Sequence, residues 1–358
     1  MIDVLNGDLL RLARQYRGLD QKELAEALGV DPATISRAEN SVVQPIDATI
    51  ERAAEKLNFP REFFYQADRL YALPLSAHPM WRRRKNASQR AMDQALAGFN
   101  IRIVHLRRLL RSLEFAPKLP IPRYEVDDYA GDIEEIASHV RKTWGIQRGP
   151  IPDLTAVVET AGIIVFHVDL EEADIDGVTI RSPGLPPCIF INKFMPADRM
   201  RFTLAHEIAH IILHRFPSAE MEAEANHFAG ALLVPKTDIH NDFIGQRIDL
   251  KTLARLKPDW KVAMQSLLYR AQELGYVDKA RAQYLWKQFN IYRYRLREPA
   301  ELDFEPERPV LVSRLIDLHL NELGYSIDEM QNVLCMFTDD IMKLYEVQPR
   351  QPGLRIVS

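Results

Sequence analysis

Residues 203–214, TLAHEIAHIILH, constrain the fold most, because they place three histidines and a glutamate inside a run of aliphatic residues. Titratable groups on what reads as a core helix need a chemical reason. Side chains four residues apart project from the same face of a helix, so the imidazoles of His206 and His210 converge on one point. A glutamate directly after the first histidine completes a pattern typical of zinc-binding helices.

Glu207 projects one position round from the histidines, where its carboxylate can hold a water at the metal and act as general base. A third ligand is still required, and the next helix offers Glu220, Glu222 and Glu224. We favour Glu222, because Asn226 lies one turn later on its face and can brace a ligand. Glu224 is the second choice.

His214 lies one turn further along the first helix and is a candidate for a supporting contact or a fourth ligand, whereas we expect His227 to be structural. The competing interpretation makes His206 and His210 hydrogen-bonded core histidines and leaves Glu207 exposed. We prefer the metal site, because a Glu-x-x-x-Asn helix follows at close range.

The whole chain excludes several classes of protein. Its 358 residues suffice for two or three domains, and its net charge of -4 argues against a protein uniformly coated by nucleic acid, though not against local basic patches. The chain has two cysteines, Cys188 and Cys335, which lie far apart in sequence and make neither a disulfide framework nor a thiolate metal cluster. The N-terminus lacks the apolar core of a signal peptide, and no stretch approaches the ~18 apolar residues of a membrane span. We therefore expect a reducing cytoplasm.

Composition and periodicity predict four segments: a helical domain over residues 1–70, a basic linker with a connecting helix over 71–119, a mixed domain over 120–245, and a helical region over 246–358. In the third segment, the β-branched run 162–168 and the short strands GVTIRS and CIFINK precede the zinc-binding helix.

The first segment predicts a helix-turn-helix. Asn6 caps a first helix that Gly18 ends, and a second helix begins near Gln21. After a glycine-containing turn, Asp31 is a good N-cap and Pro32 suits the first position of a third helix.

Residues 7–66 resemble an Xre-type, lambda-repressor-like helix-turn-helix domain. The resemblance is carried by the motifs above, within ARQYRGLDQKELAEALGVDPATISRAEN. The resemblance implies binding to an operator in double-stranded DNA. We expect Gln21 to donate to a phosphate, and Ala33, Thr34 and Arg37 to face base edges from the recognition helix. The alternative is a small protein-binding module, because the third helix carries little positive charge.

The later pair RMRFTLAHEIAHIILH and EAEANHFAGALLVP, within about residues 130–240, is similar to the ImmA/IrrE family of zinc metallopeptidase domains. The resemblance implies Zn²⁺ on His206, His210 and Glu222, with Glu207 as base, and proteolysis of very few partner proteins. Ala209 stands where that family usually has glycine, and it is small enough to leave the site intact. The expected fold is therefore multi-domain and mainly α, with a central α+β zincin-like domain and an N-terminal lambda-repressor-like helical domain.

Residues 253–277 and 315–345 each predict two helices around a turn, with Arg270 facing outward and Ser326 as a cap. Neither pair is basic enough to indicate a second nucleic-acid reader, and their Leu, Met and Tyr content fits a core or a homodimer interface. The basic stretch 82–111 is either a source of phosphate contacts or a solvated face.

These patterns together predict a DNA-binding regulatory zinc metallopeptidase that cleaves a specific partner protein such as a repressor. The alternative is a non-proteolytic transcriptional regulator or antitoxin whose peptidase-like domain binds a toxin or a signal. The presence of Glu207 beside the histidines favours the enzyme, because a binding domain has no need of a general base.

Overall fold

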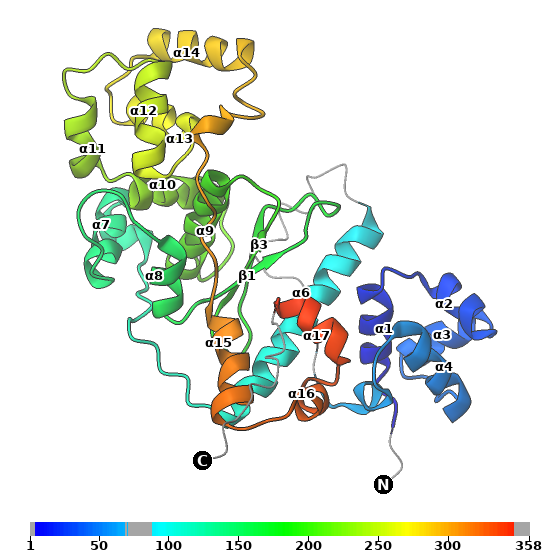
Figure 1. Ribbon diagram of the computed structural model, residues 1–358. Helices are drawn as coiled ribbons and strands as arrows, with labels where there is room; N and C mark the ends of the chain where they lie inside the picture. The colour runs from blue at the N-terminus through cyan, green and yellow to red at the C-terminus, as the bar shows by residue number, and fades with distance from the viewer. Residues whose placement is uncertain (1–3, 69, 71–87, 347–358) are drawn as a thin grey trace, which may run out of the picture. The chain divides into compact units, whose positions relative to one another are not determined.

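The protein is described by a computed structural model that covers residues 4–68, 70 and 88–346 (Figure 1). The chain forms two compact units. Among the described residues, the first unit contains 4–68, 70, 88–115 and 310–346, and the second contains 116–309. Residues 71–87, the first part of the predicted basic linker, lie outside the described residues.

The N-terminal part of the first unit is a group of short helices with strong local start signals. Asn6 Oδ1 accepts from the Asp8 N–H, and Asp31 Oδ1 accepts from the Ala33 N–H ahead of a helix that begins at Pro32. The predicted helix starts are confirmed. The elements are α1 (Gly7–Tyr16), α2 (Gln21–Leu28), α3 (Pro32–Glu39), α4 (Asp47–Leu57) and the 3₁₀ turn η1 (Arg61–Tyr65).

The first unit also contains a long helix and the C-terminal helices. His105 Nδ1 lies 2.8 Å from the Tyr345 hydroxyl, and Arg108 Nη1 donates to the Val333 carbonyl at 3.2 Å. Such contacts group residues 310–346 with the N-terminal helices rather than with the helices that precede them in sequence. The elements are α6 (Gln89–Leu109), η2 (Leu110–Ser112), α15 (Leu311–Asp317), the π-helical turn η5 (Leu318–Glu322), α16 (Ile327–Leu334) and α17 (Thr338–Tyr345).

The second unit is mostly helical around a three-stranded mixed sheet of order β1-β3-β2. β1 (Ile164–Val168) runs parallel to β3 (Cys188–Asn192), and β2 (Gly177–Ile180) runs antiparallel to β3. The helices are η3 (Val126–Tyr129), α7 (Ile133–Thr143), α8 (Leu154–Thr160), α9 (Ala197–Ile212), α10 (Met221–Leu233), α11 (Lys236–Phe243), α12 (Leu250–Trp260), α13 (Met264–Glu273), α14 (Lys279–Ile291) and η4 (Ala300–Leu302).

The core of the second unit gathers around α9, which packs against β2, β3 and α10. Its apolar residues Leu204, Ala205 and Ile208 are almost fully buried. The helix packs on the sheet (Figure 1). The fold class is therefore confirmed, with a small mixed sheet in a mostly helical chain. No helix of the described residues has the length and apolar character to cross a membrane.

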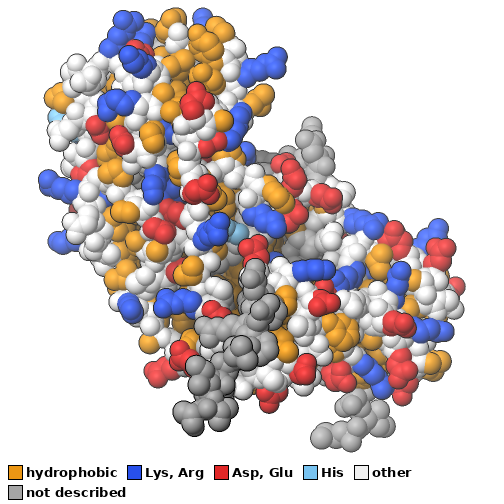
Figure 2. Space-filling view, in the orientation of Figure 1, with side chains coloured by type: hydrophobic (Ala, Val, Ile, Leu, Met, Phe, Trp, Pro, Cys, Tyr) orange, Lys and Arg blue, Asp and Glu red, His pale blue; other side chains and the backbone are white. Residues whose placement is uncertain are grey.

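The prediction that Arg270 faces outward is wrong. The residue is 2% exposed, and its guanidinium contacts Glu134 and Glu273 and donates to the Val234 carbonyl at 2.8 Å. Two carboxylates and a carbonyl offset the cost of burying this charge, so arginine fits a helix position where periodicity alone indicates a polar face. Elsewhere, basic and acidic side chains are interspersed over the visible surface (Figure 2).

Candidate metal centre

Three predicted ligands meet where α9 faces α10. His206 Nε2 and His210 Nε2 lie 3.1 Å apart, and Glu222 oxygens lie 3.5 Å from the first and 3.6 Å from the second. Tetrahedral zinc with bonds of 2.0–2.1 Å separates its ligand atoms by about 3.3 Å. The three side chains therefore have the spacing of ligands to one ion.

Hydrogen bonds on the far side of each imidazole determine which nitrogen carries the proton. His206 Nδ1 lies 3.1 Å from Asn226 Oδ1, and an amide oxygen only accepts, so Nδ1 donates. His214 Nε2 lies 3.0 Å from a Glu224 carboxylate oxygen, so neutral His214 presents Nδ1 as an acceptor to His210 Nδ1 at 2.9 Å. In their neutral forms, both histidines therefore present an unprotonated Nε2 to the centre.

The residues present fit a bound zinc ion. Glu222 Oε1 is buried and has no hydrogen-bond partner among the described residues. Two Nε2 lone pairs and a carboxylate that face one another repel unless a cation lies between them. Zinc is bound by imidazole nitrogen and carboxylate oxygen in this combination. Asn226 orients His206 through the hydrogen bond to Nδ1, whereas the sequence suggests that it supports a ligand on its own helix. Glu224 in turn contacts His214.

The electrostatics of the two histidines differ. Burial lowers the pKa of His210 to about 2, helped by the charges of His206, His214 and Arg181. Burial also lowers the pKa of His206, but the hydrogen bond to Glu222 and the charges of the nearby carboxylates raise it overall. The side of the site that carries the carboxylates thus attracts positive charge.

Glu207 is 4% exposed, so the alternative with an exposed glutamate does not describe this residue. The Thr179 hydroxyl on β2 donates to Glu207 Oε2 at 2.6 Å. Burial raises the pKa of Glu207, while His206 and the Thr179 hydrogen bond oppose that shift. A carboxyl with a raised pKa and a fixed orientation suits a general base.

Gly177 on β2 allows the sheet to approach Glu207. A Cβ at this position would lie 2.5 Å from Thr203 Cγ2 and 3.4 Å from Glu207 Cγ. The sequence motifs do not point to Thr179 or Gly177. A threonine between Val178 and Ile180 on a buried strand does, however, indicate a hydrogen-bond partner in the core.

Arginines hold the two ends of α9. Arg181 Nη2 donates to the carbonyls of His210 and Ile211 at 2.5 and 2.9 Å, where the helix C-terminus leaves orphan acceptors. Nearer the other end, Arg201 donates to the Ile151 carbonyl at 2.9 Å and contacts Glu307. The histidines therefore sit on a helix held at both ends.

The predicted DNA-contact residues lie in the first unit. Ala33 and Arg37 are exposed on α3, and Thr34 is half-buried. Arg37 Nε donates to the Ala33 carbonyl at 3.2 Å, so its guanidinium lies along its own helix. Gln21 Nε2 donates to Glu39 Oε2 at 2.8 Å, so one of the two N–H groups expected to meet a phosphate is used within the domain.

Comparison with known families agrees with this geometry. Residues 158–272 match the peptidase M78 model, described as IrrE N-terminal-like domain, and residues 7–63 match a model described as helix-turn-helix domain. Among curated proteins, none matches the chain. The protein joins a helix-turn-helix DNA-binding domain to an IrrE N-terminal-like, metallopeptidase-like domain with a candidate His-His-Glu metal group.

Proposed function

We propose that this protein is a DNA-binding regulatory zinc metallopeptidase that cleaves a specific partner protein such as a repressor. The observation that carries the proposal is the convergence of His206, His210 and Glu222 beside a buried, hydrogen-bonded Glu207. The match to an M78 domain supports the same reaction class, and the helix-turn-helix supports an operator as a further partner.

The chain supplies each group that peptide hydrolysis needs. His206, His210 and Glu222 would hold the ion, which supplies Lewis acidity when bound. Glu207 takes a proton from the attacking water and returns one to the leaving amine. The Thr179 hydroxyl keeps one Glu207 oxygen oriented, so the other is available for proton transfer.

The test compares new protein termini, by mass spectrometry, in cells that make the wild-type protein, Glu207→Gln, or the control Glu220→Gln. Glu220 is exposed and lies outside the metal group, so its variant matches the wild type. Termini made by the wild type and the control, but not by Glu207→Gln, identify the substrate. Zinc content measured on the same proteins should be equal, because Glu207 is not a ligand.

Identical termini in all three cultures, at rest and under stress, would overturn the peptidase assignment. They would favour the non-proteolytic regulator or antitoxin, whose domain binds a toxin or a signal without turnover. Zinc lost only from Glu207→Gln would instead show that Glu207 is a ligand.

DNA binding has a separate test. Arg37→Ala should weaken operator binding and leave zinc content unchanged, because Arg37 is exposed on α3 and belongs to the other unit. Unchanged operator affinity would remove Arg37 from the DNA contacts.

A further inference from the structure

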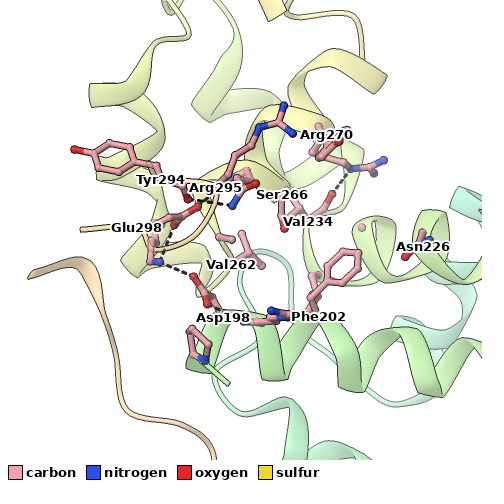
Figure 3. Close-up of a pocket in the computed structure, with 18 of the residues that line it drawn as sticks. Asp198, Phe202, Asn226, Val234, Val262, Ser266, Arg270, Tyr294, Arg295 and Glu298 are labelled. Atoms are coloured by element: carbon pink, nitrogen blue, oxygen red, sulfur yellow. Dashed lines mark hydrogen bonds and ion pairs between the residues drawn. The ribbon is translucent and has the colours of Figure 1, made fainter. Parts of the chain in front are cut away.

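The second unit contains a cavity of about 720 Å³ (Figure 3). Phe202 from α9 and Asn226 from α10 line one side. Ser266 and Arg270 from α13 and the segment 294–298 line the other. This volume falls in the range of cavities that bind ligands.

The cavity adjoins the candidate metal centre through Asn226. Asn226 lines it and also accepts the hydrogen bond from His206 Nδ1. Phe202 lies four residues before His206, about 6 Å along the helix at 1.5 Å per residue. An extended peptide advances about 3.3 Å per residue, so this offset corresponds to about two residues from a bond cut at the metal.

Part of its wall is apolar. Phe202, Leu233, Val234 and Val262 line it, and the last three are buried while Phe202 is half-buried. Gly230 also lines it, and a Cβ built there would meet nothing within 4 Å. The space in front of Gly230 is therefore open and is suited to a large apolar side chain.

The charged groups around the cavity are mostly neutralised within the protein. Lys257 pairs with Asp198 at 2.5 Å and with Glu298 at 2.8 Å. Arg270 pairs with Glu134 and Glu273. Arg199 pairs with Asp176, and Arg297 pairs with Asp303.

Arg295 is the exception. It is exposed, its guanidinium lies 4.8 Å from the Trp286 ring centroid, and it has no carboxylate partner among the described residues. One cation is thus available at the edge of an otherwise balanced cavity, where it complements an acidic group.

The rim has the composition of a protein-binding surface. Tyr269 and Leu296 line the cavity and are 62% and 85% exposed, and neighbouring Tyr292 is 56% exposed. Tyrosine and arginine are enriched at the centres of protein interfaces. Figure 2 shows hydrophobic side chains gathered near α14. A polypeptide therefore fits this site better than a small molecule does.

We propose that the cavity is a specificity pocket of the peptidase. It takes a large apolar side chain of the protein substrate, about two residues from the cut bond, next to an acidic residue that pairs with Arg295. The inference rests on the proposed function, so its test measures binding without turnover.

The test uses the full-length, zinc-loaded Glu207→Gln protein and fluorescein-labelled hexapeptides, with binding read by fluorescence anisotropy. The probes are Gly-Gly-Phe-Asp-Gly-Gly, its Asp-Phe counterpart, and matched peptides with Ala in place of Phe or Lys in place of Asp. Into the same protein we place Gly230→Leu, to fill the pocket, its control Gly230→Ala, and Arg295→Glu.

We expect one Phe-containing acidic peptide to bind about tenfold or more tighter than its Ala counterpart. Gly230→Leu should abolish that preference and Gly230→Ala should keep it, with neither variant less stable to heat, because the added atoms enter empty space. Arg295→Glu should exchange the preference for Asp for one for Lys.

Equal binding of the Phe and Ala peptides, or a preference that survives Gly230→Leu, overturns the pocket whatever the cleavage experiment shows. Preference for N-acetylphenylalaninate over every peptide, lost in Gly230→Leu, also overturns it, in favour of a small-molecule site. The expected binding pattern together with no cleavage by the wild type leaves the pocket standing and refutes the peptidase.

Discussion

Asn226 shows how one side chain outside the proposed ligand set can control the candidate metal centre. Its Oδ1 fixes the orientation and the tautomer of His206 through a 3.1 Å hydrogen bond. Asn226→Leu should therefore weaken zinc binding about 10–100-fold. Asn226→Asp still accepts the hydrogen bond and should bind zinc at least as well as the wild type. Competition with a chromophoric chelator measures both, and equal affinity in Asn226→Leu would show that the hydrogen bond is dispensable.

Gly177 is a second test at this scale. Gly177→Ala places a methyl group 2.5 Å from Thr203 Cγ2, and neither the strand nor the β-branched threonine can easily yield. The free energy of unfolding of the second unit should fall by about 1–3 kcal/mol, and peptidase activity should fall with it. Gly230→Ala is the control, because a Cβ at that position meets no atom within 4 Å. Urea unfolding followed by tryptophan fluorescence measures both, and equal stability of the two variants would refute the close approach.

At the scale of elements, α6 carries a buried histidine that makes the stability of the first unit pH-dependent. His105 is 1% exposed, and burial, with the charges of Arg108 and Arg102, lowers its pKa from 6.5 to about 3. Between pH 6.5 and about 3, His105 is therefore protonated in the unfolded chain but stays neutral in the folded chain. Stability is unaffected by this group above pH 6.5 and is lost as the pH falls through that window.

The loss due to His105 should be at most about 1.4 kcal/mol per pH unit. Hydrogen exchange of the α6 amides at pH 7.5 and 5, corrected for intrinsic rates, measures it in the wild type and in His105→Gln. Glutamine does not titrate and can keep a hydrogen bond to Tyr345, so its pH dependence should be shallower. Equal slopes in the two proteins would show that His105 is protonated in the fold.

At the scale of the whole molecule, the chain leaves the first unit after residue 115 and returns to it at residue 310. Asp340 on α17 shows how the C-terminal helices contribute to the stability of the first unit. Its carboxylate contacts the Arg17 guanidinium and accepts from Asn58 Nδ2 at 3.0 Å, so it ties the C-terminal helices to α1 and to the end of α4.

Asp340→Ala should lower the free energy of unfolding of the first unit by about 1–3 kcal/mol, because partly buried Arg17 loses its counter-charge. Asp339→Ala, next in sequence but exposed, should have little effect. Hydrogen exchange of the α1 amides distinguishes them. If the α1 amides are equally protected from exchange in both variants, the C-terminal helices do not stabilise the DNA-binding domain.

Much of the secondary structure and part of the candidate metal centre could be predicted from the sequence, because they depend on local interactions. Helix starts at Asn6, Asp31 and Ser326 depend on side chains that bond amides two or three residues away. The spacing of His206 and His210 places two imidazoles on one face of any helix. These interactions need nothing from distant parts of the chain, so a sequence pattern determines them.

Tertiary structure alone decided the rest. It placed Glu222 beside the histidines and turned Glu224 to His214, a choice that depends on the rotation of α10 against α9. It brought Thr179 to Glu207 across 28 residues and buried Arg270 against Glu134 across 136. Periodicity shows which residues of a helix are polar, but not which distant charge will meet them. Packing selects those partners, because only a satisfied charge can be buried.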